Sequence, residues 1–361
     1  GSIPTSIPSG GGDLIIGKTN TYEWDGKMSN VMLFNSSLPA TGTDSIETLY
    51  NNGTPLTTAI ATDNLKAWYK LDNNGKFDGT NWEVENQAYP ANYENALNFG
   101  TTSQLKYIAL NQLPLYNAIT ISAWIKTQKQ TTGSQTIISN SQPNPIANEK
   151  GWQLAIDQAW SSGYTKAGFE FYDSTGSTLI TIAQTSSQEL TDNKWHHVVA
   201  LWDGTTNTNA AKIFVDGLLA GQGTSSFAGP INQPVVGLEP RIGTLAYSTS
   251  GGGKSFGGGS GQDGFISNVQ TWDSSLTYGT ASSIGDTAGG QIADLYNNGT
   301  PVTTVIDETN LQCWYKLDNL TTGIQDLSNN SNNGTNNGTS QASTFVSTQV
   351  GVSSGMTEQN L

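Results

Sequence analysis

Cysteine, histidine and charged residues are scarce in this sequence. Cys313 is the single cysteine among 361 residues, so no disulfide can form within the chain. Only 2 histidines are present, and Asp, Glu, Lys and Arg together make up 12% of the residues. No apolar run approaches the roughly 20 residues that a membrane-spanning helix requires, so we expect no membrane insertion.

Basic residues are the scarcer charged type. The chain has 15 Lys and Arg against 29 Asp and Glu, which gives a net charge of −14. Binding to phosphate backbones needs clustered basic side chains, so nucleic acid is excluded as a partner. An acidic surface is compatible with solubility and with divalent cations.

Short strand patterns fill the middle of the chain. Residues 118–127 alternate apolar and polar positions as a half-buried strand does, and residues 194–202 form a more apolar strand. Residues 212–215 and 218–220 flank Asp216-Gly217, a strong hairpin signal. Long helical periodicity is absent here, so the sequence predicts an all-β fold, an antiparallel β-sandwich or jelly roll.

One stretch occurs twice. Residues 49–73, LYNNGTPLTTAIATDNLKAWYKLDN, match residues 295–319, LYNNGTPVTTVIDETNLQCWYKLDN, at 18 of 25 positions and an offset of 246 (295 − 49). This period is too long for a solenoid and fits one domain with its connector. The chain is therefore predicted to contain tandem units.

A second match sets the predicted boundaries of these units. Residues 25–38, DGKMSNVMLFNSSL, resemble residues 263–276, DGFISNVQTWDSSL, at an offset of 238 (263 − 25). The sequence then divides into the last strands of an incomplete unit, a connector, a complete unit, a second connector and the opening of a further unit. Their predicted bounds are 1–40, 41–63, 64–276, 277–309 and 310–361.

Each connector is expected to contain a short helix. In the first, Asp44 and Glu47 have the spacing of a capping box, and Gly53 can supply the left-handed residue that ends the helix. This segment is predicted to join units and not to form a site.

Several motifs carry a family resemblance. WHHVVALWDG, KIFVDGLLAG, RIGTLAY and DGFISNVQTWDSSL follow one another in an order that resembles the laminin-G-like, concanavalin-A-like jelly rolls. The opening strand of that family resembles AWYKLDNN, and in the further unit CWYKLDN followed by DLSNNSNNGT. The resemblance implies tandem concanavalin-A-like jelly rolls, similar in style to modular proteins of marine bacteriophages and bacterial surfaces.

This family includes lectins, adhesion modules, structural modules and enzyme accessory domains. We expect a non-enzymatic structural or adhesion protein of a virion or cell surface that contacts host glycans. A soluble, calcium-dependent lectin is the alternative, and a hydrolase ranks third. The incomplete outer units would be completed by neighbouring chains, by self-assembly or with other surface proteins, or by residues outside this sequence.

Catalytic signals are weak. His196 and His197 are neighbours on one predicted strand and so point to opposite faces, one into the core and one to solvent. No serine or cysteine partner for either is visible in the sequence. Glu83 and Glu85 lack the third carboxylate of the Glu-x-Asp-x-Glu pattern of glucanases, and Gly253-Lys254-Ser255 lacks the glycine and helix of a P-loop.

A structural calcium ion is the predicted cofactor. Related jelly rolls hold Ca²⁺ at the rim with Asp, Asn and carbonyl oxygens, and the predicted ligands here are Asp72, Asp203, Asp216 and Asp263. The alternative is that these Asp residues only form turns. The family often carries an acidic pair on its final strand, where this chain has Ser29-Asn30 and Ser267-Asn268.

Carbohydrate would be bound by aromatic side chains beside polar ones. Trp160 and Tyr164, in a polar turn-like segment, are the first candidates, followed by Trp82 and Tyr89. Three other tryptophans lie in strand patterns and are predicted to be core residues: Trp68, Trp124 and Trp195. Cys313 corresponds to Ala67 in the repeat, which predicts a buried apolar position.

Overall fold

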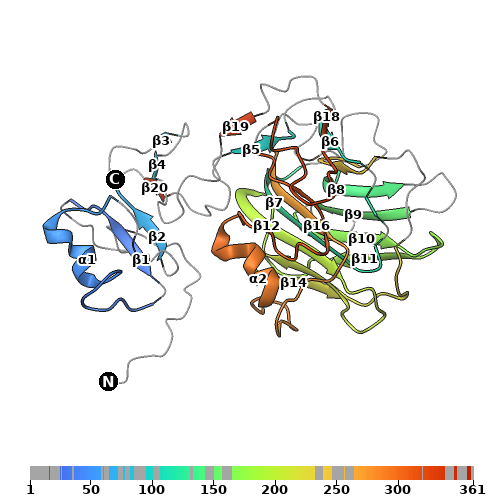
Figure 1. Cartoon of the computed structure of the whole chain (residues 1–361), viewed down its shortest axis with the longest axis horizontal. Helices are drawn as coiled ribbons and strands as arrows, with labels where there is room; N and C mark the ends of the chain where they lie inside the picture. Colours follow the sequence, from blue (N-terminus) through green and yellow to red (C-terminus); the bar gives the residue numbers. More distant parts are fainter. Residues whose placement is uncertain are drawn as a thin grey trace. The chain divides into compact units, whose positions relative to one another are not determined.

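The computed structural model divides the chain into two compact units (Figure 1). Unit 1 comprises Gly1–Pro90 and Ser354–Leu361, and unit 2 comprises Ala91–Ser353. The structure describes residues 16, 25, 27–34, 36–57, 60, 65–71, 76–77, 82–84, 95–100, 106–111, 113–114, 116–130, 133–142, 150–156, 165–231, 239–245, 256, 264–318, 320–337, 345–347 and 356–358.

Unit 2 is built from two antiparallel sheets, as the sequence predicts. The seven-stranded sheet has the order β11-β10-β9-β8-β15-β6-β18. Its strands, in chain order, are β6 (Tyr107–Ala109), β8 (Gln135–Gln142), β9 (Lys150–Ile156), β10 (Ala167–Tyr172), β11 (Leu179–Ala183), β15 (Arg241–Ile242) and β18 (Thr335–Asn337).

The eight-stranded sheet has the order β14-β13-β12-β7-β16-β5-β19, and β17 also pairs with β16. Its strands are β5 (Asn95–Asn98), β7 (Ile119–Gln128), β12 (Asp192–Trp202), β13 (Ala211–Val215), β14 (Leu218–Gly223), β16 (Gly264–Trp272), β17 (Leu311–Tyr315) and β19 (Phe345–Ser347). The predicted strands 118–127 and 194–202 are confirmed as β7 and β12.

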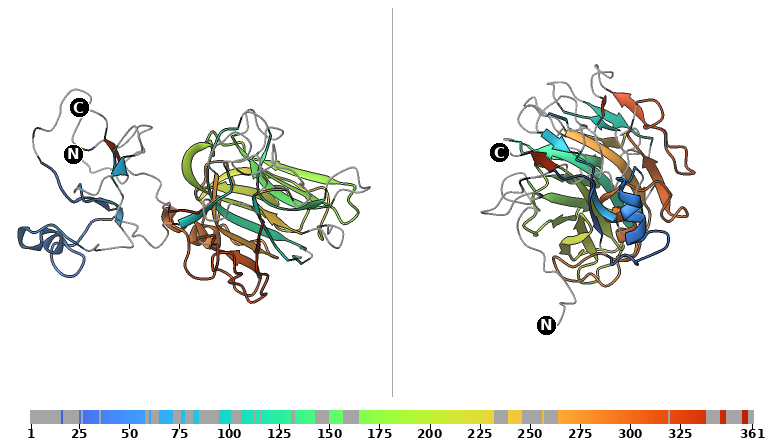
Figure 2. Two further views of the ribbon diagram at one scale, coloured as in Figure 1. Left: turned by 90° about the horizontal axis from the view of Figure 1, so that it is seen from above. Right: turned by 90° about the vertical axis from the view of Figure 1, so that its left-hand side faces the viewer.

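Two apolar cores cover the two faces of the eight-stranded sheet. Along β12, Val198 and Trp202 face the core between the sheets, whereas Val199 and Leu201 face a second core. That second core contains Ile292 of the helix α2 (Gly290–Tyr296). The connector that carries α2, drawn in orange, runs along one side of unit 2 (Figure 2). The expectation of a half-buried strand is therefore wrong for β7, because a second layer covers its outer face, whereas the more apolar character predicted for β12 agrees with its burial.

The predicted hairpin at Asp216-Gly217 is confirmed. Asp216 and Gly217 join β13 to β14 with φ values of 48° and 75°. Positive φ at both residues is the requirement of a two-residue type I′ turn, which matches the twist of the flanking strands. The local dipeptide was sufficient to predict this turn.

Unit 1 contains two small sheets. β1 (Val31–Phe34) pairs with β2 (Leu65–Tyr69), and β4 (Trp82–Val84) pairs with β3 (Lys76–Phe77) and β20 (Met356–Glu358). The side chains of Leu65 and Trp68 form a small core with Met32, Phe34 and Leu56. Trp68 is 3% exposed, as expected for a core residue.

The first connector forms a shorter helix than predicted. α1 spans Ile46–Tyr50 and is followed by the 3₁₀ turn η1 (Asn51–Gly53). Ser45, and not Asp44, is the N-cap, since its hydroxyl accepts from the Thr48 N–H at 3.2 Å. Asn51, and not Gly53, is the left-handed C-cap with φ 44°. Ser and Asn are common at these positions, so the error concerned register and not residue type.

The repeated stretches form one structural module twice. In unit 1, Met32 lies opposite Trp68, and in unit 2, Gln270 lies opposite Trp314. The next pair is Leu33 with Ala67 in the first module and Thr271 with Cys313 in the second. A register shift follows at the same place in both ladders. The connector helix α2 and its 3₁₀ turn η2 (Asn297–Gly299) likewise repeat α1 and η1.

A hydrogen-bonded cluster fixes the register of each module. In unit 2, Ser267 Oγ and the Asn268 N–H both donate to the carbonyl of Lys316, at 2.9 and 3.0 Å. In unit 1, Ser29 Oγ and the Asn30 N–H donate to the carbonyl of Lys70, both at 3.1 Å. The Ser-Asn dipeptide therefore joins the two strands of each module by hydrogen bonds.

The arrangement of strands differs from the predicted domain bounds. β17 and β18 were expected to open a further unit at 310–361, but they complete the two sheets of unit 2. β2 was expected to open the complete unit at 64–276, but it pairs with β1 in unit 1. Sequence repeats mark equivalent segments, but they do not show which sheet each segment joins.

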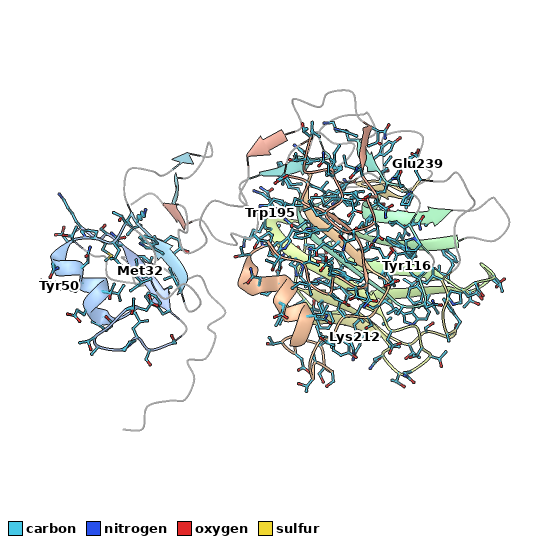
Figure 3. All side chains as sticks on the ribbon, in the orientation of Figure 1. Met32, Tyr50, Tyr116, Trp195, Lys212 and Glu239 are labelled. Atoms are coloured by element: carbon cyan, nitrogen blue, oxygen red, sulfur yellow. The ribbon has the colours of Figure 1, made fainter. Side chains whose placement is uncertain are left out.

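The first module is less covered than the second. Ile46 is 54% exposed, whereas its counterpart Ile292 is fully buried at 0%. Leu33 on β1 is 40% exposed, and its counterpart Thr271 is 0% exposed. Figure 3 labels Tyr50 at the end of α1, where its side chain is 68% exposed. The first module therefore has an exposed apolar face in unit 1, whereas the equivalent face of the second module is buried within unit 2.

Candidate functional site

A polar pocket of about 360 Å³ lies beside β17. Glu308 and Thr309 come from the end of the second connector, Leu311 and Gln312 from β17, and Asn329 and Asn330 from the following loop. The described lining residues thus offer one carboxylate, three side-chain amides and one hydroxyl. These groups include both donors and acceptors of hydrogen bonds.

Asp326 holds the asparagine-rich loop of this pocket in place. Its carboxylate accepts from the backbone N–H groups of Trp314, Ser328 and Asn332, each at 2.9 Å. It also accepts from Ser328 Oγ at 2.7 Å. A carboxylate that binds several N–H groups makes a compact turn, so the pocket wall is formed before any ligand arrives.

The asparagines of the loop are anchored to the strand and to the connector. Asn330 Nδ2 donates to the carbonyl of Leu311 at 2.9 Å, and Asn329 Nδ2 donates to Glu308 Oε1 at 3.0 Å. These contacts leave the Glu308 carboxylate and the Asn329 amide oxygen with further capacity for hydrogen bonds. Because none of the described lining residues is aromatic, ligand binding here would rest on hydrogen bonds and not on stacking.

Sequence reasoning did not identify these pocket residues. The signal that was available is the run DLSNNSNNGT, which the family resemblance treats as an opening turn. The pocket is formed by the close packing of this run against the connector end and β17, which sequence patterns alone do not reveal.

His196 lies between two carboxylates. Its Nδ1 is 2.8 Å from Asp216 Oδ2, and its Nε2 is 3.0 Å from Asp192 Oδ1. Burial lowers the pKa of His196, but the hydrogen bonds and charges of Asp216 and Asp192 outweigh it and raise that pKa above 6.5. Both ring nitrogens are engaged, so the imidazole has no free position for a metal ion or a substrate proton.

His197 is also buried, which corrects the expectation that one of the two histidines faces solvent. Its Nε2 is 2.8 Å from Ser122 Oγ on the neighbouring strand, and its ring stacks on Trp124 with centroids 4.9 Å apart. Burial lowers the pKa of His197 to about 4, against the opposing charge of Asp216. A serine partner therefore exists, although the sequence did not reveal it.

The Ser122–His197 pair is not arranged for nucleophilic catalysis. The two residues are each 1% exposed, and Trp124 and Tyr296 stack over the imidazole. A nucleophile must reach the carbon that it attacks, and these atoms are sealed inside the molecule. The pair serves to satisfy two buried polar groups.

The predicted metal ligands fall into two groups. Asp72 and Asp263 lie outside the described residues. Asp203 Oδ1 accepts from the Thr205 N–H at 2.9 Å, and Asp216 binds His196 and the His197 N–H. Within the described part of the chain, no three His, Cys, Asp or Glu side chains gather at one point. Asp203 and Asp216 therefore take part in local hydrogen bonding.

The predicted sugar-binding aromatics are described only in part. Trp160, Tyr164 and Tyr89 lie outside the described residues, and Trp82 lies on β4, for which only the backbone is described. Trp124 and Trp195 are 3% and 5% exposed, so their assignment to the core is confirmed. No helix in the described part of the structure is long and apolar enough to cross a membrane.

Comparison with protein families gives one match, which spans residues 99–280 and about half of the chain. The matching model is a laminin-G-type model described as the concanavalin A-like lectin/glucanases superfamily. The protein belongs to this superfamily. Comparison of this superfamily member with curated protein sequences gives no match.

Solved structures with a related fold include three from distant sources. A candidate carbohydrate binding protein from Bacteroides ovatus has 20% identity, a TM-score of 0.46, and coverage of 76% of this chain and 65% of its own. A pentraxin from Limulus polyphemus has 17% identity, a TM-score of 0.34, and coverage of 51% of this chain and 78% of its own. Mouse laminin α1 domains have 17% identity, a TM-score of 0.33, and coverage of 50% of this chain and 41% of their own. This superfamily member thus spans slightly less than two thirds of the first of these proteins.

Proposed function

We propose that this protein is a non-enzymatic carbohydrate-binding and adhesion module of an extracellular, cell or virion surface, and that it binds a glycan in the pocket beside β17. The observation that carries the proposal is the preformed polar wall of Glu308, Gln312, Asn329 and Asn330. Sugars present closely spaced hydroxyls, and amide and carboxylate groups bind these as donors and acceptors. Membership of a superfamily that includes lectins supports this assignment.

A binding function is favoured over hydrolysis by the carboxylates of the pocket. Glycosidases use two carboxyl groups that flank the scissile bond. Glu308 is the single carboxylate among the described lining residues, and Asp326 behind it is occupied by four hydrogen bonds. We therefore propose that a sugar is held in this pocket and is not cleaved.

We propose the aromatic residues identified from the sequence as a separate candidate site. Trp160 and Tyr164, with Trp82 and Tyr89 as further candidates, would supply a stacking surface for a sugar ring. Stacking on one face of a sugar ring and hydrogen bonding along its edge are complementary modes of recognition.

The test is a glycan array screened with the full chain and with three variants. The double variant Glu308→Ala/Asn329→Ala removes the carboxylate and one amide of the pocket, and Trp160→Ala removes the first aromatic candidate. Glu239→Ala is the matched control, since Glu239 is an exposed carboxylate outside the pocket (Figure 3).

We expect selective binding that the double variant loses and the Glu239→Ala control keeps. Loss with Trp160→Ala alone would move the site to the aromatic segment. A folded protein that binds no glycan on the array would overturn the carbohydrate proposal and leave assembly as the function.

The role of calcium is tested by adding a chelator to the full chain and measuring its melting temperature and its glycan binding. We propose a structural Ca²⁺ ion at the predicted ligands Asp72, Asp203, Asp216 and Asp263. A bound ion stabilises the folded state, so a chelator should lower the melting temperature of the full chain. An unchanged melting temperature, with glycan binding retained, would exclude the calcium-dependent lectin.

A further inference from the structure

The position beside β16 is occupied by a strand that has a near-identical counterpart elsewhere in the chain. β17 reads LQCWY and β2 reads LKAWY, and both continue as KLDN. Each pairs antiparallel with its acceptor strand in the same register, with the same register shift. We propose that β2 of a second copy of this chain can take the position of β17 beside β16, while β17 pairs with β1 of that second copy.

The side chains that decide the fit are the same in both donor strands. Trp314 Nε1 donates to Asn268 Oδ1 at 3.2 Å, and Trp68 Nε1 donates to Asn30 Oδ1 at 2.7 Å. The lysine that follows lies over the tryptophan ring in both cases, at 5.9 Å for Lys316 and 4.8 Å for Lys70. The inward-facing difference is Ala67 in place of Cys313, a smaller side chain that the buried position can accept.

The acceptor strands are equally interchangeable. The Ser-Asn dipeptide that binds the donor carbonyl is present in both, as Ser29-Asn30 and Ser267-Asn268. The residue that follows is Val31 in β1 and Val269 in β16, each opposite the donor tyrosine. The ladder bonds themselves join backbone groups and do not depend on side chains. Both acceptors therefore offer the same backbone and Ser-Asn contacts to β2 and to β17, and the Thr271–Cys313 contact is the side-chain difference.

The connectors provide the length for an exchange. Residues 35–64 join β1 to β2, and residues 273–310 join β16 to β17. In each connector a helix and a 3₁₀ turn are followed by a residue with extended backbone angles, Thr54 or Thr300. A change of backbone angles after the 3₁₀ turn can redirect the strand and leave the helix in place.

Reciprocal exchange keeps the number of strand pairs constant. Every acceptor edge remains covered, so the exchanged dimer loses no ladder. β1–β2 and β16–β17 lie in different units, so the interface joins unit 1 of one copy to unit 2 of the next. Such a head-to-tail interface is heterologous, and repetition of it gives rings or filaments.

The native Cys313 makes this exchange measurable. In the exchanged dimer, β17 of one copy pairs with β1 of the other. Cys313 of the first copy then takes the place of Ala67 opposite Leu33 of the second copy. The wild-type chain is co-refolded at high concentration with the variant Leu33→Cys/Cys313→Ala and is then oxidised. Directly opposed residues of antiparallel strands lie within disulfide range. We expect a disulfide-linked heterodimer on a non-reducing gel.

A second mixture tests the other half of the exchange. Chains with Ala67→Cys/Cys313→Ala and chains with Thr271→Cys/Cys313→Ala should also form a heterodimer. Ala67 and Thr271 are 7% and 0% exposed, so chance collision of folded chains does not bring them together. If one variant of either mixture fails to fold, the other mixture still decides the proposal.

Two controls measure how much disulfide forms within one chain and how much forms by random oxidation between chains. Thr271→Cys with native Cys313 should close a disulfide within one chain, since Thr271 Oγ1 and Cys313 Sγ are 3.2 Å apart. Leu218→Cys/Cys313→Ala mixed with wild type measures random oxidation, because Leu218 is 39% exposed and Leu33 is 40% exposed. No more heterodimer than in the Leu218 control would overturn the proposal.

Discussion

Trp314 donates its indole N–H to the Oδ1 atom of Asn268 across the β16–β17 ladder. Asn268 has φ 46° and is 4% exposed, so it combines a left-handed backbone with a buried amide. Asn tolerates this conformation better than most residues, and its side chain satisfies an indole that would otherwise be buried unpaired. Asn268 thus provides both the left-handed backbone conformation in β16 and the hydrogen-bond acceptor for the Trp314 indole.

We predict that Asn268→Ala destabilises unit 2 by about 2 kcal/mol, from the lost hydrogen bond and the left-handed backbone of a non-glycine residue. Asn268→Asp keeps an acceptor oxygen and should cost less. Chemical unfolding followed by tryptophan fluorescence measures both. Equal losses for the two variants would show that the indole hydrogen bond contributes nothing.

Ile46 and Ile292 occupy equivalent positions in the two modules, but Ile46 is exposed and Ile292 is buried. We predict that Ile292→Asp lowers the stability of unit 2 by about 3 kcal/mol or more, because it buries an unpaired carboxylate in the second core. Ile46→Asp should change stability by about 0.5 kcal/mol or less, because Ile46 is 54% exposed. Calorimetry of the two variants tests this, and a similar loss at position 46 would mean that α1 is covered in solution.

The two histidines should act on stability in opposite pH ranges. The pKa of His197 is about 4 in the folded protein and 6.5 in the unfolded chain. The unfolded chain therefore binds more protons than the folded protein between pH 4 and pH 6.5. Stability is therefore lost as pH falls through that range, by roughly 3 kcal/mol for this group. His197→Gln should flatten the acid limb of the curve of unfolding free energy against pH.

His196 should show the reverse sign. Its folded pKa lies above 6.5, so its stabilising contribution is complete below pH 6.5 and is lost as pH rises through the folded pKa. His196→Gln should remove this alkaline loss and leave the acid limb unchanged. A variant that changes both limbs equally would show that the two imidazoles titrate as one group.

The thiol of Cys313 should be inert in the native protein. Burial raises its pKa to about 12, and its exposed fraction is 0%. A thiol reagent at pH 8 should therefore react only when β17 leaves the sheet. Leu33→Cys/Cys313→Ala, with a thiol at an exposed position, should react at once. Immediate labelling of wild-type Cys313 would mean that β17 is open in most molecules.

Local features of this fold were predictable from the sequence. The hairpin at Asp216-Gly217 and the strands β7 and β12 follow from dipeptides and alternation over a few residues. The core positions of Trp124 and Trp195 follow from the same strand patterns. In these cases the physical cause lies within about ten residues of the chain.

The partners of several residues could not be predicted, because they come from distant strands. Ser122 meets His197, and Asp192 and Asp216 meet His196, only after β7, β12 and β13 have paired in register. The repeat identified β2 and β17 as equivalents, but two edges with the same chemistry were available to each. The pocket at Glu308 and Asn329 was missed because its side-chain hydrogen bonds join residues about 20 apart in the chain.

The closing strands of unit 2 also determine when this unit can fold. β18 at residues 335–337 pairs with β6 at residues 107–109, and β19 at residues 345–347 pairs with β5 at residues 95–98, so neither sheet is complete until these late strands have been synthesised. Contacts of such long sequence separation form slowly. During synthesis β2 emerges before β16 exists, and β17 emerges after it, so the nascent chain exposes an open β16 edge for a time. Crowding of nascent chains on one message would bring other copies of β2 close during that interval.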